Sequence, residues 1–357
     1  MKKNILVIDD SALMRRVICD IIHSSSDFQV ADICRDGLEG YEKLCAGKYD
    51  GVLLDINMPR MDGLELLKKL KEENRKATVI IVSSLSVKGA DVTLRAIELG
   101  AVDFVTKPEN FIEAKGESFK DALLGTLDAV CGKPKRHSSA GRTKHGHRAD
   151  RTAKPTRCKK TGTPRKKLIA LACSTGGPKA LQSVIPYMDQ KMDAPMIVVQ
   201  HMPEGFTKSM ANRLNELSSV TVKEAEDGEL LKKGVVYVAP GGKHLKIRQA
   251  ATGQHRVELG DEPPVGRLKP CANITYESLR QCAYDEVTCV VLTGMGEDGT
   301  KGIVSLARDV PVYIIAQDKE SCVVYGMPRA IAETGLTDEV VPLEQVAKSI
   351  LKNVGVK

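Results

Sequence analysis

Residues 168–178 read Leu-Ile-Ala-Leu-Ala-Cys-Ser-Thr-Gly-Gly-Pro, a short apolar run that ends at a serine, two glycines and a proline. The apolar run has the length and composition of a buried β-strand. Pro178 stands where an α-helix can begin, because the first helical residue needs no backbone N–H. The segment therefore predicts a strand that passes through a tight turn into a helix, which is the repeating unit of parallel α/β sheets.

The same alternation continues towards the end of the chain. Three further apolar runs predict strands of the same sheet: Met196–Gln200, Val287–Thr293 and Val312–Ala316. Three shorter runs lie around Pro-Gly-Gly and Thr-Gly turns and predict a small antiparallel insertion: Val235–Ala239, Leu245–Gln249 and Arg256–Leu259. Residues 168–357 are thus expected to form one α/β domain with a small β insertion.

Residues 1–130, at the N-terminal end of the chain, show the same alternation of strands and helices. Five strand candidates alternate with amphipathic stretches such as Leu64–Lys71 and Val92–Leu99; the strands are Ile5–Ile8, Gln29–Cys34, Gly51–Leu54, Thr78–Val82 and Ala101–Val105. This alternation predicts a second doubly wound parallel sheet. Ligands of such sheets bind at the carboxyl ends of the strands, so polar residues at those ends matter most for function.

The segment 131–167 separates the two domains. The whole chain of 357 residues has a net charge of +7, but this segment alone has fourteen Lys or Arg residues and one acid, so it carries +13 and the remainder carries −6. Its composition predicts a disordered, extended basic linker. The rest of the chain lacks the uniformly basic surface that nucleic-acid binding would require. The linker is either simply solvated or attracts the protein to acidic protein surfaces or anionic lipid.

Cellular location and redox state follow from what the sequence lacks. No stretch reaches the roughly 20 apolar residues that cross a bilayer, and the first residues, MKKNILVIDD, meet two acids before any signal-peptide core could form. We expect a cytoplasmic protein without membrane insertion. The ten cysteines are scattered, with no Cys-x-x-Cys pair, which favours free thiols over a zinc site or a disulfide framework.

Acidic residues mark the strand ends of the first domain. Asp9 and Asp10 close its first strand and Asp55 closes the third, while Ser83 follows the fourth and Lys107 the fifth. Each Asp alone is equally compatible with helix capping. Together they predict an oxygen-rich pocket suited to Mg²⁺, in which a carboxylate can accept a phosphoryl group that lysine and serine then hold.

Residues 1–125 also resemble a known family. The segments VIDDSALMR, LLDINMPRMDG, VSSL and FVTKP are similar to the flavodoxin-like receiver domains of two-component response regulators. The resemblance implies that Asp55 is the phosphoacceptor, that Asp9, Asp10 and Asp55 bind Mg²⁺, and that Ser83 and Lys107 contact the phosphoryl group.

Three residues of the second domain form a candidate catalytic set. Ser174 lies at the carboxyl end of one strand, His201 follows the next in VVQHMPEGF, and Asp298 follows a third in LTGMGEDG. A serine nucleophile, a histidine base and an aspartate that orients the base constitute a hydrolase triad. Alone, the serine turn is compatible with a purely structural turn, and the histidine with a helix cap or a core hydrogen-bonding residue.

One glycine pattern supports a competing hypothesis. Gly294-x-Gly296-x-x-Gly299 follows a strand and fits the dinucleotide fingerprint, with Asp318 about 20 residues further on. However, Glu297 and Asp298 would place two carboxylates where a pyrophosphate should bind. A nucleotide-dependent enzyme therefore remains an alternative. A DNA-binding response regulator that uses the basic segment is a second alternative, although the second domain shows no helix-turn-helix pattern.

A second resemblance covers residues 168 to about 350. ACSTGGP, VVQHMPEGF, VYVAPGGKHL and LTGMGEDGTKG are similar to the catalytic domain of chemotaxis protein-glutamate methylesterases, the CheB family. The resemblance implies a Ser174–His201–Asp298 triad, with Thr175 and the backbone N–H of Met295 near the oxyanion and the histidine. It implies that no cofactor serves the esterase.

The two resemblances together imply the activity and its partners. The expected enzyme hydrolyses glutamate γ-methyl esters on methyl-accepting chemotaxis receptors, and deamidates receptor glutamines. A chemotaxis histidine kinase is the expected phosphodonor. Before phosphorylation, the first domain should cover the catalytic strand ends of the second.

Overall fold

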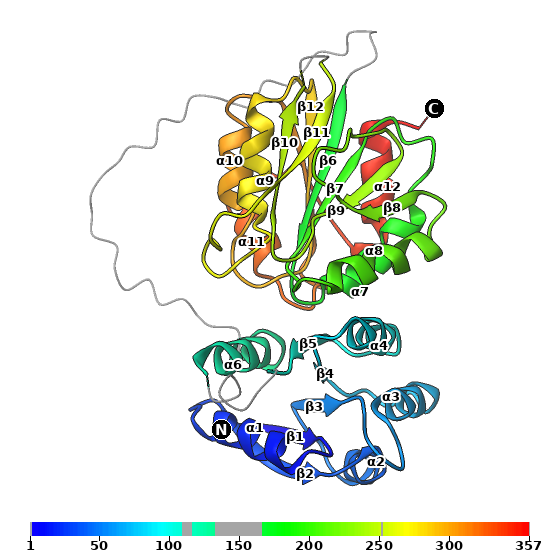
Figure 1. The fold of residues 1–357 in the computed structure, drawn as a ribbon, viewed down its shortest axis with the longest axis vertical. Coiled ribbons are helices and arrows are strands. Elements are labelled where there is room, and N and C mark those ends of the chain that lie inside the picture. The colour runs from blue at the N-terminus through cyan, green and yellow to red at the C-terminus, as the bar shows by residue number, and fades with distance from the viewer. Residues whose placement is uncertain (1, 109–115, 133–165, 251–252, 357) are drawn as a thin grey trace, which may run out of the picture.

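The structure is a computed structural model, and it describes residues 2–108, 116–132, 166–250 and 253–356. Figure 1 shows two α/β domains, an N-terminal domain in blue to cyan and a C-terminal domain in green to red. The predicted basic linker lies almost entirely outside the described residues. No helix among those that are described has the length and apolarity to cross a membrane.

The N-terminal domain has a parallel five-stranded sheet in the order β2-β1-β3-β4-β5. Its strands are β1 (Lys3–Ile8), β2 (Phe28–Cys34), β3 (Gly51–Asp55), β4 (Val79–Ser83) and β5 (Asp103–Thr106). Its helices are α1 (Ala12–His23), α2 (Gly37–Ala46), α3 (Gly63–Glu72), α4 (Val87–Glu98) and α6 (Glu117–Cys131). The predicted strands are all present. Strands β1, β3 and β4 contain continuous apolar runs that are buried on both faces, whereas β2 and β5 alternate more buried residues with more exposed ones.

The C-terminal domain has a parallel seven-stranded sheet in the order β14-β13-β12-β6-β7-β9-β8. Its strands are β6 (Lys167–Cys173), β7 (Met196–Gln200), β8 (Thr221–Glu224), β9 (Val235–Val238), β12 (Glu286–Val291), β13 (Val312–Gln317) and β14 (Glu339–Val341). A separate antiparallel pair comprises β10 (His244–Gln249) and β11 (His255–Gly260).

Helices cover both faces of the large sheet. They are α7 (Gly177–Gln182), η1 (Ile185–Tyr187), α8 (Phe206–Leu217), α9 (Ala272–Ser278), η2 (Leu279–Gln281), α10 (Thr300–Leu306), α11 (Met327–Ala332) and α12 (Leu343–Val354). In Figure 1, α9, α10 and α11 lie on one side of the sheet and α8 and α12 on the other. The predicted class, two doubly wound parallel sheets with a small antiparallel insertion, is confirmed.

One predicted strand has the wrong partner. The turn pattern predicts the run Val235–Ala239 as part of the antiparallel insertion, but β9 pairs in parallel with both β7 and β8 inside the large sheet. Its side chains at Val236, Tyr237 and Val238 are all buried, as expected for a strand covered on both faces. The insertion therefore contains two strands rather than three.

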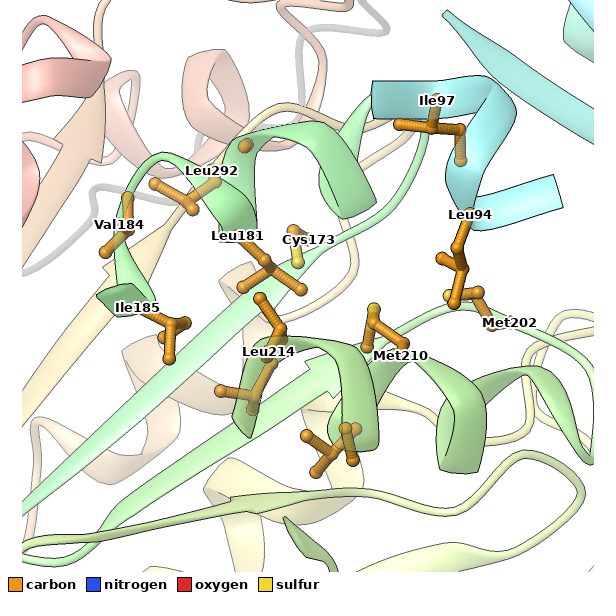
Figure 2. Close-up of a cluster of buried hydrophobic side chains, with 14 of the residues drawn as sticks. Leu94, Ile97, Cys173, Leu181, Val184, Ile185, Met202, Met210, Leu214 and Leu292 are labelled. Carbon is orange, nitrogen blue, oxygen red and sulfur yellow. The ribbon is translucent and has the colours of Figure 1, made fainter. Parts of the chain in front are cut away.

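The two domains are in direct contact. The α4 helix of the N-terminal domain packs against α7 and α8 of the C-terminal domain, and Figure 1 shows α4, β5 and α6 along the side that faces the second domain. Figure 2 shows Leu94 and Ile97 of α4 in the same buried cluster as Met202 and Met210. The apolar core is thus continuous across the domain boundary.

Candidate active site

The register of the large sheet brings the serine and the histidine together. Strands β6 and β7 are parallel, with Cys173 opposite Gln200. Ser174 and His201 are the next residues of the two strands, so both leave the same sheet edge as neighbours. The backbone N–H of His201 donates to the Cys173 carbonyl at 3.3 Å, which keeps the two strand ends together.

Asp298 reaches the histidine from the loop between β12 and α10. Its carboxylate is 6% exposed and lies 2.8 Å from His201 Nε2. It also accepts the backbone N–H groups of Ala272 at 2.6 Å and Asn273 at 3.0 Å. Burial raises the pKa of this carboxyl, but the His201 interaction and the two N–H groups outweigh burial and lower the pKa to about 2. Asp298 is therefore ionised, Nε2 of His201 is the donor, and Nδ1 is left as the acceptor.

Ser174 begins a tight turn. The N–H of Gly177 donates to the Ser174 carbonyl at 2.7 Å, and Gly176 has φ +76° and ψ −3°, which are the values of the third residue of a type II turn. A Cβ at Gly176 would lie 2.7 Å from the Val323 side chain, so both backbone angle and space require glycine. The described contacts contain no hydrogen bond between the side chains of Ser174 and His201.

A second loop packs against the serine side chain. A Cβ on Gly294 would lie 2.9 Å from the Cβ of Ser174, which shows how closely this backbone approaches the serine side chain. Met295 follows directly. Among the described residues, the backbone N–H groups of Thr175 and Met295 donate to no protein acceptor. Both N–H groups belong to segments next to Ser174, and the oxyanion role that the resemblance implies for them stays a prediction.

The glycine-rich loop has another use than nucleotide binding. Residues Gly294–Gly299 do follow a strand and precede α10. However, the carboxylate of Asp298 is buried and makes hydrogen bonds with His201 and with the backbone N–H of Ala272 at the start of α9. The dinucleotide hypothesis required this position to face a pyrophosphate.

Residues that the sequence analysis missed also shape the site. The Asn273 side-chain oxygen accepts the N–H groups of Gly299 at 3.1 Å and Gly302 at 2.7 Å, so Asn273 fixes the loop that carries Asp298. Gln200, at the end of β7, donates to the Ser174 carbonyl. A polar residue that ends an apolar strand beside a candidate histidine was the available signal for Gln200. No sequence pattern indicated Asn273.

The second candidate site is the acidic pocket of the N-terminal domain. Asp9, Asp10 and Asp55 each place an oxygen within 4.8 Å of the others. Lys107 Nζ lies 2.9 Å from Asp9 Oδ2 and 2.8 Å from Asp55 Oδ2. Burial raises the pKa of Asp55 in spite of Lys107. Three converging carboxylates with one lysine suit a divalent cation, because an added positive charge relieves their repulsion.

Ser83 borders the same pocket. Residues Asp55, Asn57 and Ser83 line a cavity of about 360 Å³. The Ser83 hydroxyl accepts a hydrogen bond of 2.7 Å from Thr93 of α4, a residue that the sequence analysis did not single out. All five residues predicted for this pocket therefore lie together, and α4 connects the pocket to the domain contact.

The N-terminal domain contacts the segments that follow Ser174 and His201. The carboxyl of Asp103 in β5 interacts with the Thr175 side chain and the Gly176 backbone N–H. Phe104 stacks on Phe206, at the start of α8, with ring centroids 4.8 Å apart. Arg213 of α8 forms two hydrogen bonds with Glu98, of 2.6 and 3.1 Å. The turn after Ser174 and the helix after His201 are both held by this domain.

Comparisons with known proteins agree with this architecture. Residues 169–350 match the CheB methylesterase family model, and residues 5–115 match that of the response regulator receiver domain. The chain is 39% identical to a protein-glutamate methylesterase/protein-glutamine glutaminase 1 of Syntrophomonas wolfei, over 98% of this chain and 99% of that protein.

Two further relatives extend the agreement. A protein-glutamate methylesterase/protein-glutamine glutaminase of Bacillus subtilis is 40% identical, over 97% of each chain. The solved CheB methylesterase catalytic domain of Thermotoga maritima has 41% identity and a TM-score of 0.51, and covers 53% of this chain and 99% of that chain. The chain therefore belongs to the CheB methylesterase family, with a response regulator receiver domain preceding the methylesterase domain.

Proposed function

We propose that this protein hydrolyses glutamate γ-methyl esters on chemotaxis receptors and deamidates receptor glutamines, and that phosphorylation at Asp55 raises its activity. The full-length match to enzymes named for these two reactions supports the substrate class. The observation that carries the chemistry is the 2.8 Å contact between His201 and the buried Asp298, beside Ser174 at adjacent strand ends.

In this mechanism His201 is the general base. Its Nδ1 takes the proton of Ser174, and the serine oxygen attacks the ester carbonyl. Ionised Asp298 stabilises the imidazolium that forms. His201 then protonates the departing methoxy group, and methanol leaves. Water, deprotonated by His201, attacks the resulting acyl-enzyme and releases the glutamate carboxylate and Ser174.

The oxyanion is held by backbone groups. The N–H groups of Thr175 and Met295, which have no acceptor in the described part of the chain, lie next to Ser174, where negative charge would develop on the ester carbonyl oxygen. In other serine hydrolases one such donor contributes a factor of about 10²–10³ in kcat. The hydrogen bond between Ser174 and His201 is expected to form when substrate binds, because catalytic hydrogen bonds are commonly loose in the free enzyme.

The receiver domain supplies the control. Asp9, Asp10 and Asp55 would hold Mg²⁺, which supplies positive charge for the incoming phosphoryl oxygens. Asp55 then accepts the phosphoryl group from a chemotaxis histidine kinase, and Lys107 and Ser83 hold it. Lys107 and Ser83 belong to the ends of β5 and β4, and Ser83 is bonded to α4, so the new charge acts on the elements that contact the methylesterase domain.

Methanol release from methylated receptor membranes tests the proposal. The full-length protein is assayed with and without a small phosphodonor and Mg²⁺. We expect release that increases with the phosphodonor, no stimulation in Asp55→Asn, and loss of catalysis in Ser174→Ala. Full release by Ser174→Ala would reject the catalytic assignment, and equal release in both states would reject the control by phosphorylation.

A further inference from the structure

Both proposed oxyanion donors belong to peptide groups whose carbonyls are held from the opposite side. The Ser174 carbonyl accepts from Gly177 N at 2.7 Å and from Gln200 Nε2 at 3.1 Å. The Gly294 carbonyl accepts from Gly326 N at 3.1 Å and from Met327 N at 2.8 Å. A trans peptide is planar, so its N–H points away from its C=O. Anchoring each carbonyl therefore also fixes the direction of the Thr175 or Met295 N–H.

Gln200 is the one side chain among these four anchors. It is 2% exposed, and its amide is held at both ends. Its Oε1 lies 3.0 Å from the donor Cys173 Sγ, and its Nε2 also donates to the His201 carbonyl at 3.2 Å. This set of partners decides the orientation of the amide, because a thiol faces its oxygen and two carbonyls face its nitrogen.

The space around the amide is equally restricted. A Cβ on Gly177 would lie 1.9 Å from Gln200 Oε1. The amide thus sits directly on the backbone of the turn that follows Ser174. Any larger residue at position 177 would displace it.

We infer that Gln200 is a positioning residue for the ester hydrolysis, one that holds the Ser174–Thr175 peptide so that the Thr175 N–H faces the developing oxyanion. The inference rests on the proposed function and deepens it. Without the Gln200 donor, the Ser174 carbonyl keeps only the Gly177 contact, and the peptide plane is free to tilt. The loss then falls on the transition state, where the oxyanion exists, rather than on the bound ester.

The test uses two substitutions in the full-length protein, with phosphodonor, Mg²⁺ and methylated receptor membranes. Gln200→Met keeps the approximate size of the side chain and removes both donors. We expect kcat to fall about ten- to a hundredfold with KM within about twofold, somewhat less than the loss of a whole oxyanion donor. The pH midpoint of activity should stay where it is in the unaltered protein, because Gln200 contacts His201 only at the backbone and the contact between the His201 and Asp298 side chains remains.

Gln200→Glu provides a readout that a merely structural role would not move. The carboxylate still accepts from Cys173, but it places an unprotonated oxygen against two carbonyls. When protonated, it regains one donor. The activity of this variant relative to the unaltered protein should therefore rise as the pH falls.

Thr288→Val is the matched control. Thr288 is buried in β12, and its hydroxyl donates to Asn353 Oδ1 at 2.7 Å, away from the catalytic loops. This variant also loses a buried hydrogen bond, so its melting temperature should fall, but its kcat should not. A Gln200→Met protein with unchanged kcat, or with a change in KM alone, would overturn the inference.

Gly177→Ala keeps the inference testable if Gln200→Met does not fold. Its added methyl group should displace the Gln200 amide and lower kcat although the glutamine is present; unchanged kcat would count against the inference. An unaltered protein that releases no methanol would instead contradict the proposed function, so the two failures are distinguishable.

Discussion

The contact between Asp298 and His201 stabilises the fold and is also part of the proposed catalytic triad. The pKa of Asp298 is about 2 against an ordinary 3.8, because the His201 contact and two backbone N–H groups outweigh burial. A carboxyl with a lowered pKa stabilises the folded protein above its unfolded pKa, and this contribution disappears as the pH falls through about 2. The difference corresponds to about 2 kcal/mol at neutral pH.

Asp298→Asn should therefore lower both activity and stability. An amide cannot stabilise the imidazolium or hold the same histidine tautomer, so kcat for methanol release should fall about 10³–10⁴-fold. Thermal unfolding at neutral pH should show a lower melting temperature. Asp338→Asn is the control, because Asp338 also accepts a backbone N–H, that of Ile314 at 2.9 Å, but lies in the turn before β14. Comparable kcat values in the two variants would contradict the role of Asp298.

The residues proposed to react stand out in the sequence, whereas Asn273 and Thr93, which hold the loops and helices around them, do not. Ser174, His201 and Asp298 each stand in a glycine- or proline-marked segment next to an apolar run. Asn273 accepts backbone N–H groups, and Thr93 donates to the Ser83 hydroxyl. These hydrogen bonds depend on the path of loops and on helix packing, which local sequence patterns do not specify.

The strands show the same division. Long apolar runs such as β7 were predicted with their observed ends, because burial on both faces leaves a clear pattern. The edge strands β8 and β14 are short and carry polar residues, so no run of apolar residues marked them. The error at β9 arose from the Pro-Gly-Gly turn that follows it, since that turn suggested a hairpin although the next strand belongs to another sheet.

Helices α4 and α8 are joined across the domain contact by an ion pair, so this part of the contact can be tested by charge-reversal substitutions. Arg213 and Glu98 share two hydrogen bonds and are both partly exposed. Such a pair contributes about 0.2–1 kcal/mol, which corresponds to at most about a fivefold change in an equilibrium. Arg213→Glu, which adds like-charge repulsion, should release the contact and raise methanol release several-fold without phosphodonor.

The reciprocal exchange separates this effect from general damage. Arg213→Glu combined with Glu98→Arg should restore low activity without phosphodonor, because the pair is rebuilt with reversed charges. Arg248 and Glu258 form a matched two-bond pair within the β10–β11 hairpin, and Arg248→Glu should leave this activity unchanged. Equal effects of Arg213→Glu and Arg248→Glu would reject a specific role of the α4–α8 contact.

The contact between the two domains places one buried carboxyl, that of Asp103, against the turn that follows Ser174. Burial raises the pKa of Asp103 to about 7, although hydrogen bonds from Phe104, Thr175 and Gly176 act to lower it. A carboxyl with a raised pKa favours the contact most below its ordinary pKa of 3.8, and this preference is lost as the pH rises through about 7. Between pH 6 and pH 8 the equilibrium for domain contact should weaken about tenfold.

Asp103→Asn should abolish this pH dependence, because the amide is neutral throughout and still offers an oxygen to Thr175 and Gly176. Methanol release without phosphodonor is measured for both proteins from pH 6 to pH 8, and their ratio cancels the titration of His201. From pH 6 to pH 8, methanol release by the unaltered protein should increase up to about tenfold relative to that by the variant, since one pKa unit corresponds to a factor of ten. Asp121→Asn removes an exposed ion pair with Arg267 across the same contact, and should raise this activity similarly at every pH. Parallel pH profiles of the unaltered protein and Asp103→Asn would show that protonation of Asp103 does not control the contact between the domains.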